Sequence, residues 1–108
     1  MLKRAIYEQE LEKLGGIFKD IEESKRKLVE GLIDDAAFLK AENCVLKKLL
    51  DETGMIKVHP INKEIQRPTE AAKQYLKNIN AYSVVIKVLN GILSKSIVED
   101  DDELDDYE

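Results

Sequence analysis

The sequence predicts a small all-α protein, and three observations lead to that prediction. Its 108 residues contain no Trp and only 6% aromatic residues, so the core must be built mainly from Leu, Ile, Val and Ala. Apolar residues recur at alternating spacings of three and four, which is the period of a helix face. A heptad pattern runs through the C-terminal half. We expect one helical domain at residues 1–94 and an acidic tail at residues 95–108.

The first helix is predicted at about residues 3–30. Its apolar face consists of Tyr7, Leu11, Leu14, Phe18, Ile21, Leu28 and Leu32. Gly15 and Gly16 interrupt this face without shifting its register, so we interpret the pair as a bend or flexible joint. Gly31 can adopt the left-handed conformation that ends helices, and it predicts the end of this one.

A second helix is predicted at residues 34–52. Asp34 or Asp35 is expected to cap its N-terminus, where the helix dipole favours a negative charge. Its apolar residues cover more than one stripe, which indicates contacts on two sides and a central position. Gly54 follows as the expected stop, and residues 55–59 are expected to be extended or a loop.

The third helix is predicted at residues 60–94. Pro60 suits a first helical turn with His59 near the cap, whereas Pro68 predicts a kink or a restart. The heptad seam of this helix consists of Ala72, Tyr75, Ile79, Tyr82, Ile86, Leu89 and Leu93. A helix this long exceeds what a small monomer easily covers, so we expect part of the seam to meet another subunit. The alternative is that the whole seam packs on the first two helices.

Charge is distributed unevenly along the chain. Net charge is 0 over residues 1–30, −2 over residues 31–53, +5 over residues 54–98 and −8 over residues 99–108. The acidic tail has almost nothing to bury and is predicted to be disordered in isolation. Its acids, a candidate partner-binding set, are Glu99, Asp100, Asp101, Asp102, Glu103, Asp105, Asp106 and Glu108.

Four basic residues in the predicted third helix are candidates for nucleic-acid contacts. Lys63 and Arg67 form one pair at four-residue spacing, and Lys73 and Lys77 form another. Each pair should project from one side of the helix, as phosphate contacts require. The alternative is an ordinary solvated helix face.

No pattern in the sequence predicts catalysis, a cofactor or a metal site. Cys44 and His59 are the single residues of their types, so no Cys/His zinc site can form within one chain. No glycine loop of the phosphate-binding type is present, and no run of residues approaches the length of a membrane span. We expect a non-enzymatic, cytoplasmic protein without a small-molecule substrate.

Residues 17–93 resemble the small subunits of phage terminases, the DNA-packaging proteins of tailed phages and prophages. The resemblance rests on three segments in order: residues 32–39 (LIDDAAFL), residues 52–56 (ETGMI), and His59-Pro60 leading to residues 71–76 (AAKQYL). One branch of the family has an Asp early in the second helix, a Glu-x-Gly-apolar close and an Asn-Pro start to the third. Asp35, Gly54 and Pro60 match this pattern, and His59 replaces the Asn. Residues 80–86 (NAYSVVI) depart from the Gly-Leu-Thr-Pro often found next.

This resemblance implies a non-catalytic subunit that assembles into a homo-oligomeric ring in the bacterial host cell. It would bind double-stranded phage DNA at the packaging start site and recruit the large terminase subunit, which carries the ATPase and nuclease. For the tail we consider docking to a basic surface of the large subunit, intramolecular competition with DNA for the basic helix, or a purely solubilising role. A different class remains open: a helical scaffold or antitoxin-like module that binds another protein and never DNA.

Overall fold

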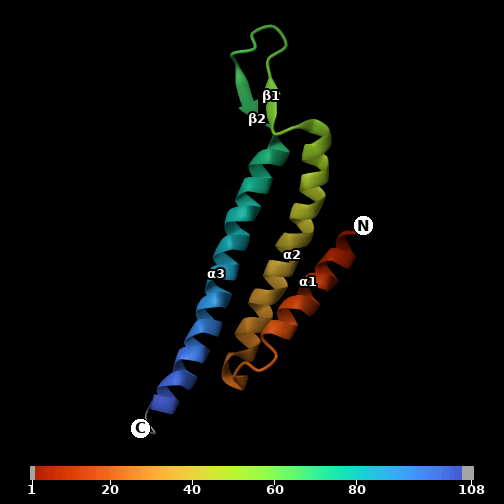
Figure 1. The fold of residues 1–108 in the computed structure, drawn as a ribbon. Helices are drawn as coiled ribbons and strands as arrows, with labels where there is room; N and C mark the ends of the chain where they lie inside the picture. Colours follow the sequence, from red (N-terminus) through yellow and green to blue (C-terminus); the bar gives the residue numbers. More distant parts are fainter. Residues whose placement is uncertain (1, 106–108) are drawn as a thin grey trace.

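The computed structural model describes the backbone of residues 2–105 and the side chains of residues 2–95. Three helices and one β-hairpin follow one another along the chain (Figure 1): α1 (Lys3–Ile17), α2 (Glu23–Thr53), β1 (Ile56–Val58), β2 (Gln66–Pro68) and α3 (Glu70–Asp105). The predicted all-α class, with three helices and a long C-terminal one, is confirmed. Among the described residues, no helix is apolar over a stretch long enough to cross a membrane.

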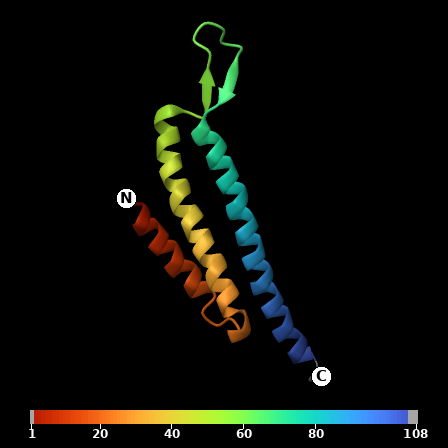
Figure 2. The same ribbon diagram turned by 180° about the vertical axis from the view of Figure 1, so that it is seen from behind.

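The helices form an elongated antiparallel arrangement. α2 and α3 run side by side in opposite directions, and α1 folds back along α2 (Figures 1 and 2). α2 is therefore the central element with contacts on two sides, as its apolar pattern predicts. The hairpin projects from the end of the α2–α3 pair, and the molecule extends over 74 Å. The hairpin and the C-terminal end of α3 therefore lie at opposite ends of the long axis.

The first predicted helix boundary is wrong. The helix expected over residues 3–30 ends at Ile17, and a turn at residues 18–22 reverses the chain before α2 begins. Gly15 and Gly16 lie in the last turn of α1, just before the chain reverses. The bend predicted at this glycine pair is therefore close to the true reversal. Phe18 and Ile21 are both buried. The apolar spacing continues across the turn because α1 and α2 face the same core.

The predicted break at Gly31 is also wrong, since α2 continues through it from Glu23 to Thr53. Asp34 and Asp35 are consequently exposed residues within a helix and do not cap one. A helical glycine costs about 1 kcal/mol relative to alanine. Burial of Val29 and Ile33 on either side of Gly31 outweighs this cost.

Residues 60–68 form no helix, in contrast to the prediction. They belong to the hairpin, in which Ile56 pairs with Pro68 and Val58 pairs with Gln66. Residues 56–58 are extended, as expected for their β-branched side chains. The predicted restart near Pro68 is confirmed, because α3 begins at Glu70. Thr69 caps this helix: its Oγ1 accepts a hydrogen bond of 3.1 Å from the Ala72 amide.

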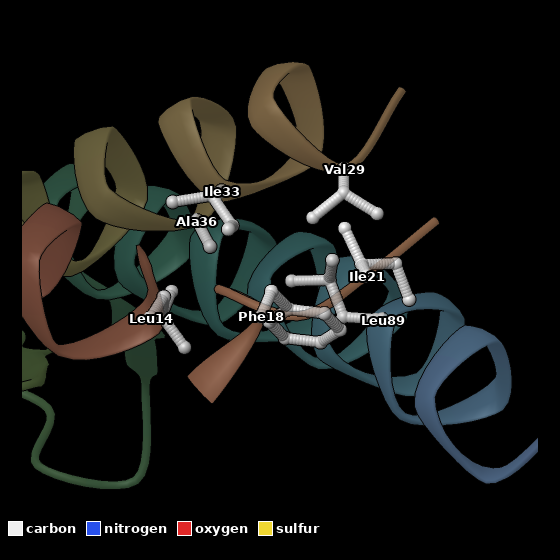
Figure 3. Close-up of a cluster of buried hydrophobic side chains, with 7 residues drawn as sticks. All are labelled: Leu14, Phe18, Ile21, Val29, Ile33, Ala36 and Leu89. Carbon is white, nitrogen blue, oxygen red and sulfur yellow. The ribbon is translucent and has the colours of Figure 1, made fainter. Parts of the chain in front are cut away.

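The main core lies where the three helices meet (Figure 3). Leu14 and Ala36 enter it from α1 and α2, and Leu89 enters from α3, where it is 1% exposed. The complete buried cluster consists of Leu14, Phe18, Ile21, Val29, Ile33, Ala36 and Leu89. The turn between α1 and α2 therefore contributes directly to the core that fixes α3.

The predicted heptad seam of α3 packs largely within the chain. Ala72 and Leu89 are fully buried, and Tyr82, Ile86 and Leu93 pack against the core cluster. The alternative prediction, in which the seam packs on the chain's own helices, therefore holds for these five residues. Assembly of copies stays a prediction. Among the described side chains of α3, the large apolar ones that remain exposed are Leu76, Val84 and Val88.

α2 has a matching heptad seam that is polar at its centre. Lys40, Asn43 and Lys47 occupy three successive seam positions between Ala36 and Leu50. The Lys40 ammonium lies 5.8 Å from the centre of the Tyr82 ring, so these two residues face each other across α2 and α3. Asn43 and Lys47 line one hollow of about 320 Å³ together with Tyr75 and Ile79 of α3.

Replacing Asn43 with leucine is expected to raise the free energy of unfolding. Asn43 is 8% exposed and its Oδ1 has no hydrogen-bond partner among the described residues. Removing a buried polar group without a partner should stabilise the fold by about 1–3 kcal/mol. Urea denaturation followed by circular dichroism measures the change. Asn80→Leu, at an exposed position of α3, controls for helix propensity, and equal effects of the two variants would contradict the prediction.

The prediction for the acidic tail falls mostly outside the described side chains. The backbone of α3 continues to Asp105, whereas residues 106–108 lie beyond the described backbone. Disorder of residues 95–108 in isolation stays a prediction, as does the boundary between a domain at 1–94 and a tail.

Candidate nucleic-acid interface

The β-hairpin presents two basic side chains directly opposite each other. β1 and β2 are antiparallel, and Lys57 pairs with Arg67. Residues that pair across two strands project from the same face of the hairpin. Like charges in such a pair destabilise it, and neither side chain has an ion pair or hydrogen bond within the described part of the chain. A pair of this kind is well suited to bind an anion that offsets the repulsion.

Local hydrogen bonds shape the loop between the two strands. The His59 Nδ1 accepts hydrogen bonds from the amides of Ile61, at 3.1 Å, and Asn62, at 3.0 Å. His59 thus acts as a cap, although for a tight loop and not for the predicted helix. The Asn62 side chain accepts a further bond from the Glu64 amide, at 3.2 Å. These bonds hold the loop in a defined shape without a packed core beneath it.

One face of the hairpin is hollowed. The hollow has a volume of about 380 Å³ and is lined by Lys57, Val58, His59, Pro60, Ile65 and Arg67. Its lining therefore combines two basic side chains with apolar residues. We call this the hairpin hollow. The loop beside it exposes Ile61 to 88% of its possible surface, which is unusual for isoleucine.

The hairpin leads directly into the basic start of α3. The Thr69 amide donates to the Met55 carbonyl at 2.9 Å, and the Thr69 hydroxyl donates to the Gly54 carbonyl at 3.3 Å. These two bonds close the base of the hairpin against the first turn of α3. Basic residues on both elements are consequently held at one end of the molecule.

The structure divides the four predicted contact residues between two elements. Lys63 and Arg67 lie on the hairpin, and Lys73 and Lys77 lie in the first turns of α3; all four are exposed. Lys73 pairs with Glu70 at 3.1 Å. Their predicted arrangement as two pairs on one helix is wrong for Lys63 and Arg67, because the prolines at 60 and 68 frame a hairpin. Lys57, the partner of Arg67, belongs to the basic segment 54–98 but was not among the four predicted contacts, because its place opposite Arg67 depends on the hairpin.

Basic residues of α1 and of the start of α2, an alternative place for DNA to bind, are mostly paired with acidic residues. Lys3 pairs with Glu42 at 2.7 Å, Arg4 with Glu8 at 3.1 Å, and Arg26 with Glu23 at 2.9 Å. Lys25 lies 3.9 Å from Glu22. In contrast, Lys57, Lys63, Arg67 and Lys77 have no acidic partner in the described part of the chain. The hairpin end is therefore the stronger candidate for binding an external anion.

A hydrogen-bonded polar pair, a buried Glu10 and a partly buried Tyr82, lies between α1 and α3, away from the hairpin. Glu10 is 6% exposed, and its Oε1 accepts a hydrogen bond of 3.1 Å from the Tyr82 hydroxyl. Burial raises the pKa of Tyr82 above its ordinary value, and the neighbouring Glu10 carboxylate raises it further. On the surface, the hydrogen bond to Asp34 raises the pKa of Tyr7. Both hydroxyls are structural donors.

Unfolding at alkaline pH provides a test of the Tyr82–Glu10 contact. Because the folded-state pKa exceeds the unfolded value of about 10, the stabilisation is complete below pH 10 and is lost as the pH rises through the folded-state pKa. Tyr82→Phe should lower the free energy of unfolding by about 1–3 kcal/mol at pH 7, since it leaves a buried carboxylate without its donor. The deficit should shrink above pH 10. Urea denaturation between pH 7 and 11 measures it, with Tyr75→Phe as the control; a deficit that persists at high pH would contradict the assignment.

The described residues contain no group of three or more His, Cys, Asp or Glu side chains placed to hold a metal ion. Cys44 is a free, partly exposed cysteine that lines the same hollow as Asn43 and Ile79. The side chains of the acidic residues 99–108 lie outside the described set. Comparison of the chain with models of protein families, with curated proteins and with solved structures found no match.

Proposed function

We propose that the chain is a non-catalytic DNA-binding subunit of the small-terminase type. The observation that supports this most is the projecting hairpin, with Lys57 and Arg67 directly opposed and unpaired among the described residues. Lys63 on the loop and Lys77 on α3 extend the same basic end of the molecule. In this proposal the chain binds the packaging start site on phage DNA and brings the large ATPase-nuclease subunit to it.

A two-stranded antiparallel hairpin is an element that can bind in the major groove of duplex DNA. The major groove of B-DNA is about 12 Å wide and admits a two-stranded β-ribbon. A hairpin whose strands are exposed on both faces can enter such a groove without unfolding anything else. Lys57 and Arg67 would then contact phosphates of the groove walls, and the repulsion between them would be relieved by the phosphate charge.

Assembly and recruitment are further parts of the proposal. A ring multiplies weak contacts of one subunit through effective concentration. Exposed apolar side chains on two helices are available for subunit contacts: Phe38, Val45 and Leu49 on α2, and Leu76, Val84 and Val88 on α3. The large subunit would carry the chemistry that this chain is proposed to lack.

Titration of the full chain with a fluorescently labelled duplex tests DNA binding. Five phosphate contacts, by Lys57, Lys63, Arg67, Lys73 and Lys77, predict that log K falls with log salt at a slope of about −4.5 per subunit. Fluorescence anisotropy at several salt concentrations between 50 and 300 mM would measure this slope. Failure to bind duplex DNA at the lowest salt would refute the proposal.

The second candidate is a helical interaction module that binds a protein and never DNA. Exposed apolar residues of the hairpin favour it, because Ile56, Val58, Ile61 and Ile65 are all solvent-accessible. The titration with labelled duplex DNA distinguishes the two candidate functions. A protein-binding module should give no duplex binding that falls systematically with salt.

A further inference from the structure

The two charged ends of the chain lie at opposite ends of the molecule. Figures 1 and 2 show the hairpin at one end of the long axis and the C-terminal end of α3 at the other. Residues 54–98 carry a net charge of +5, and residues 99–108 carry −8. The strongest attraction available to the hairpin within this sequence is therefore to the acidic segment, from which the fold separates it.

A tail cannot occupy the hairpin hollow of its own chain. The helical rise places Glu70 and Lys95 about 38 Å apart along α3, and Lys57 and Arg67 lie beyond Glu70. Residues 96–108 span at most about 45 Å when fully extended. Only the last residue or two would reach the base of the hairpin. The backbone of α3 in fact stays helical to Asp105, which takes the chain still farther away.

The hairpin hollow and the tail match in chemistry. Lys57 and Arg67 line the hollow. The apolar residues Val58, Pro60 and Ile65 line it as well. The tail sequence, EDDDELDDYE, has eight acids interrupted by Leu104 and Tyr107. A leucine or tyrosine flanked by carboxylates can cover the apolar part of the lining while the carboxylates contact the two basic side chains.

We propose that the acidic segment 99–108 of one copy docks in the hairpin hollow of a second copy. The contact is heterologous, joining the tail of one molecule to the hairpin of the next, and such contacts generate rings when the rotation between copies closes. It covers Lys57 and Arg67, so it also competes with DNA. Only the competition with DNA rests on the proposed function.

Sedimentation velocity of full-length variants tests the docking directly. In the tail variant, every Asp and Glu of residues 99–108 is replaced by Asn or Gln; in the hairpin variant, Lys57→Glu and Arg67→Glu are combined. At 50 mM salt the unmodified chain should self-associate in a concentration-dependent way, and at 500 mM it should dissociate. Each variant alone should associate at least tenfold more weakly than the unmodified chain at 50 mM.

Mixing the two variants gives the decisive result. The tail variant retains an intact hairpin and the hairpin variant retains an intact tail, so an equimolar mixture should form heterodimers. Recovery of association in the mixture also shows that both variants are folded. Absence of heterodimers, or unchanged self-association of the tail variant, would overturn the proposal.

Two further measurements separate specific docking from diffuse attraction and from the DNA hypothesis. Leu104→Ser with Tyr107→Ser keeps every charge and should weaken self-association about fivefold; no change would mean that the hollow is not the docking site. In the anisotropy titration, the tail variant should bind duplex DNA several-fold more tightly than the unmodified chain. If neither binds DNA while heterodimers form, the docking stands and the proposed function fails.

Discussion

Replacing Lys57 and Arg67 together with glutamate is expected to weaken duplex DNA binding by roughly 100-fold at 50 mM salt. The change removes two phosphate contacts and places two negative charges where the DNA backbone would lie. The log–log salt slope should become shallower by about 1.8 for the two lost contacts. Both side chains are exposed on a hairpin outside the helical core, so the helices should be unaffected.

The matched control is Lys13→Glu with Lys19→Glu. These lysines are exposed near the α1–α2 turn, far from the hairpin, and their reversal changes the net charge by the same amount. The control should weaken binding only slightly. An equal loss in both variants would mean that DNA responds to net charge alone. Unchanged binding in the hairpin variant would move the site elsewhere, with Lys3, Arg4, Lys25, Arg26 and Lys27 as the next set to test.

Truncating Leu89 to alanine is expected to lower the free energy of unfolding by about 3 kcal/mol. Leu89 is 1% exposed and is the residue of α3 within the central cluster, where it meets side chains of α1, α2 and their connecting turn. Its loss leaves a cavity at the point where the three helices meet. A domain of this size has a stability of only about 5–15 kcal/mol, so the effect is a large share of the total.

Leu76→Ala is the matched control for this measurement. It makes the same substitution on the same helix, at a side chain that is 50% exposed. Its effect should stay below about 1 kcal/mol. Urea denaturation followed by helical circular dichroism compares the two variants. If Leu89→Ala were no more destabilising than Leu76→Ala, α3 would not be held by the described core.

The helical content followed from the sequence, whereas the end of the first helix and the starts of the second and third did not. The apolar spacing from Tyr7 to Leu32 is continuous because α1 and α2 pack on the same core. A regular spacing of apolar residues gives no sign of a chain reversal between two helices that face one core. Gly31 looked like a stop because its intrinsic propensity is poor. Packing of Val29 and Ile33 decided otherwise, since tertiary burial is worth more than the propensity of one residue.

The basic residues of the candidate interface were recognised from sequence, but their arrangement was not. Lys63 and Arg67 are four residues apart, which suits a helix, and Pro60 suits a first helical turn. The pairing of Lys57 with Arg67 is a contact between strands and cannot be read from spacing along the chain. The ion pairs that neutralise Lys3 and Arg4 likewise depend on which acids the fold brings near them.

By itself the sequence determined the helical class, the central position of the second helix, the restart after Pro68 and the separation of basic and acidic segments. These features depend on local periodicity, backbone restriction and charge count, all of which act over a few residues. Tertiary structure alone decided where the chain reverses, that the α3 seam packs on its own α2, and that the basic residues stand on a projecting hairpin. Those outcomes depend on contacts between residues distant in sequence, where burial of side chains such as Phe18 and Leu89 outweighs local preference.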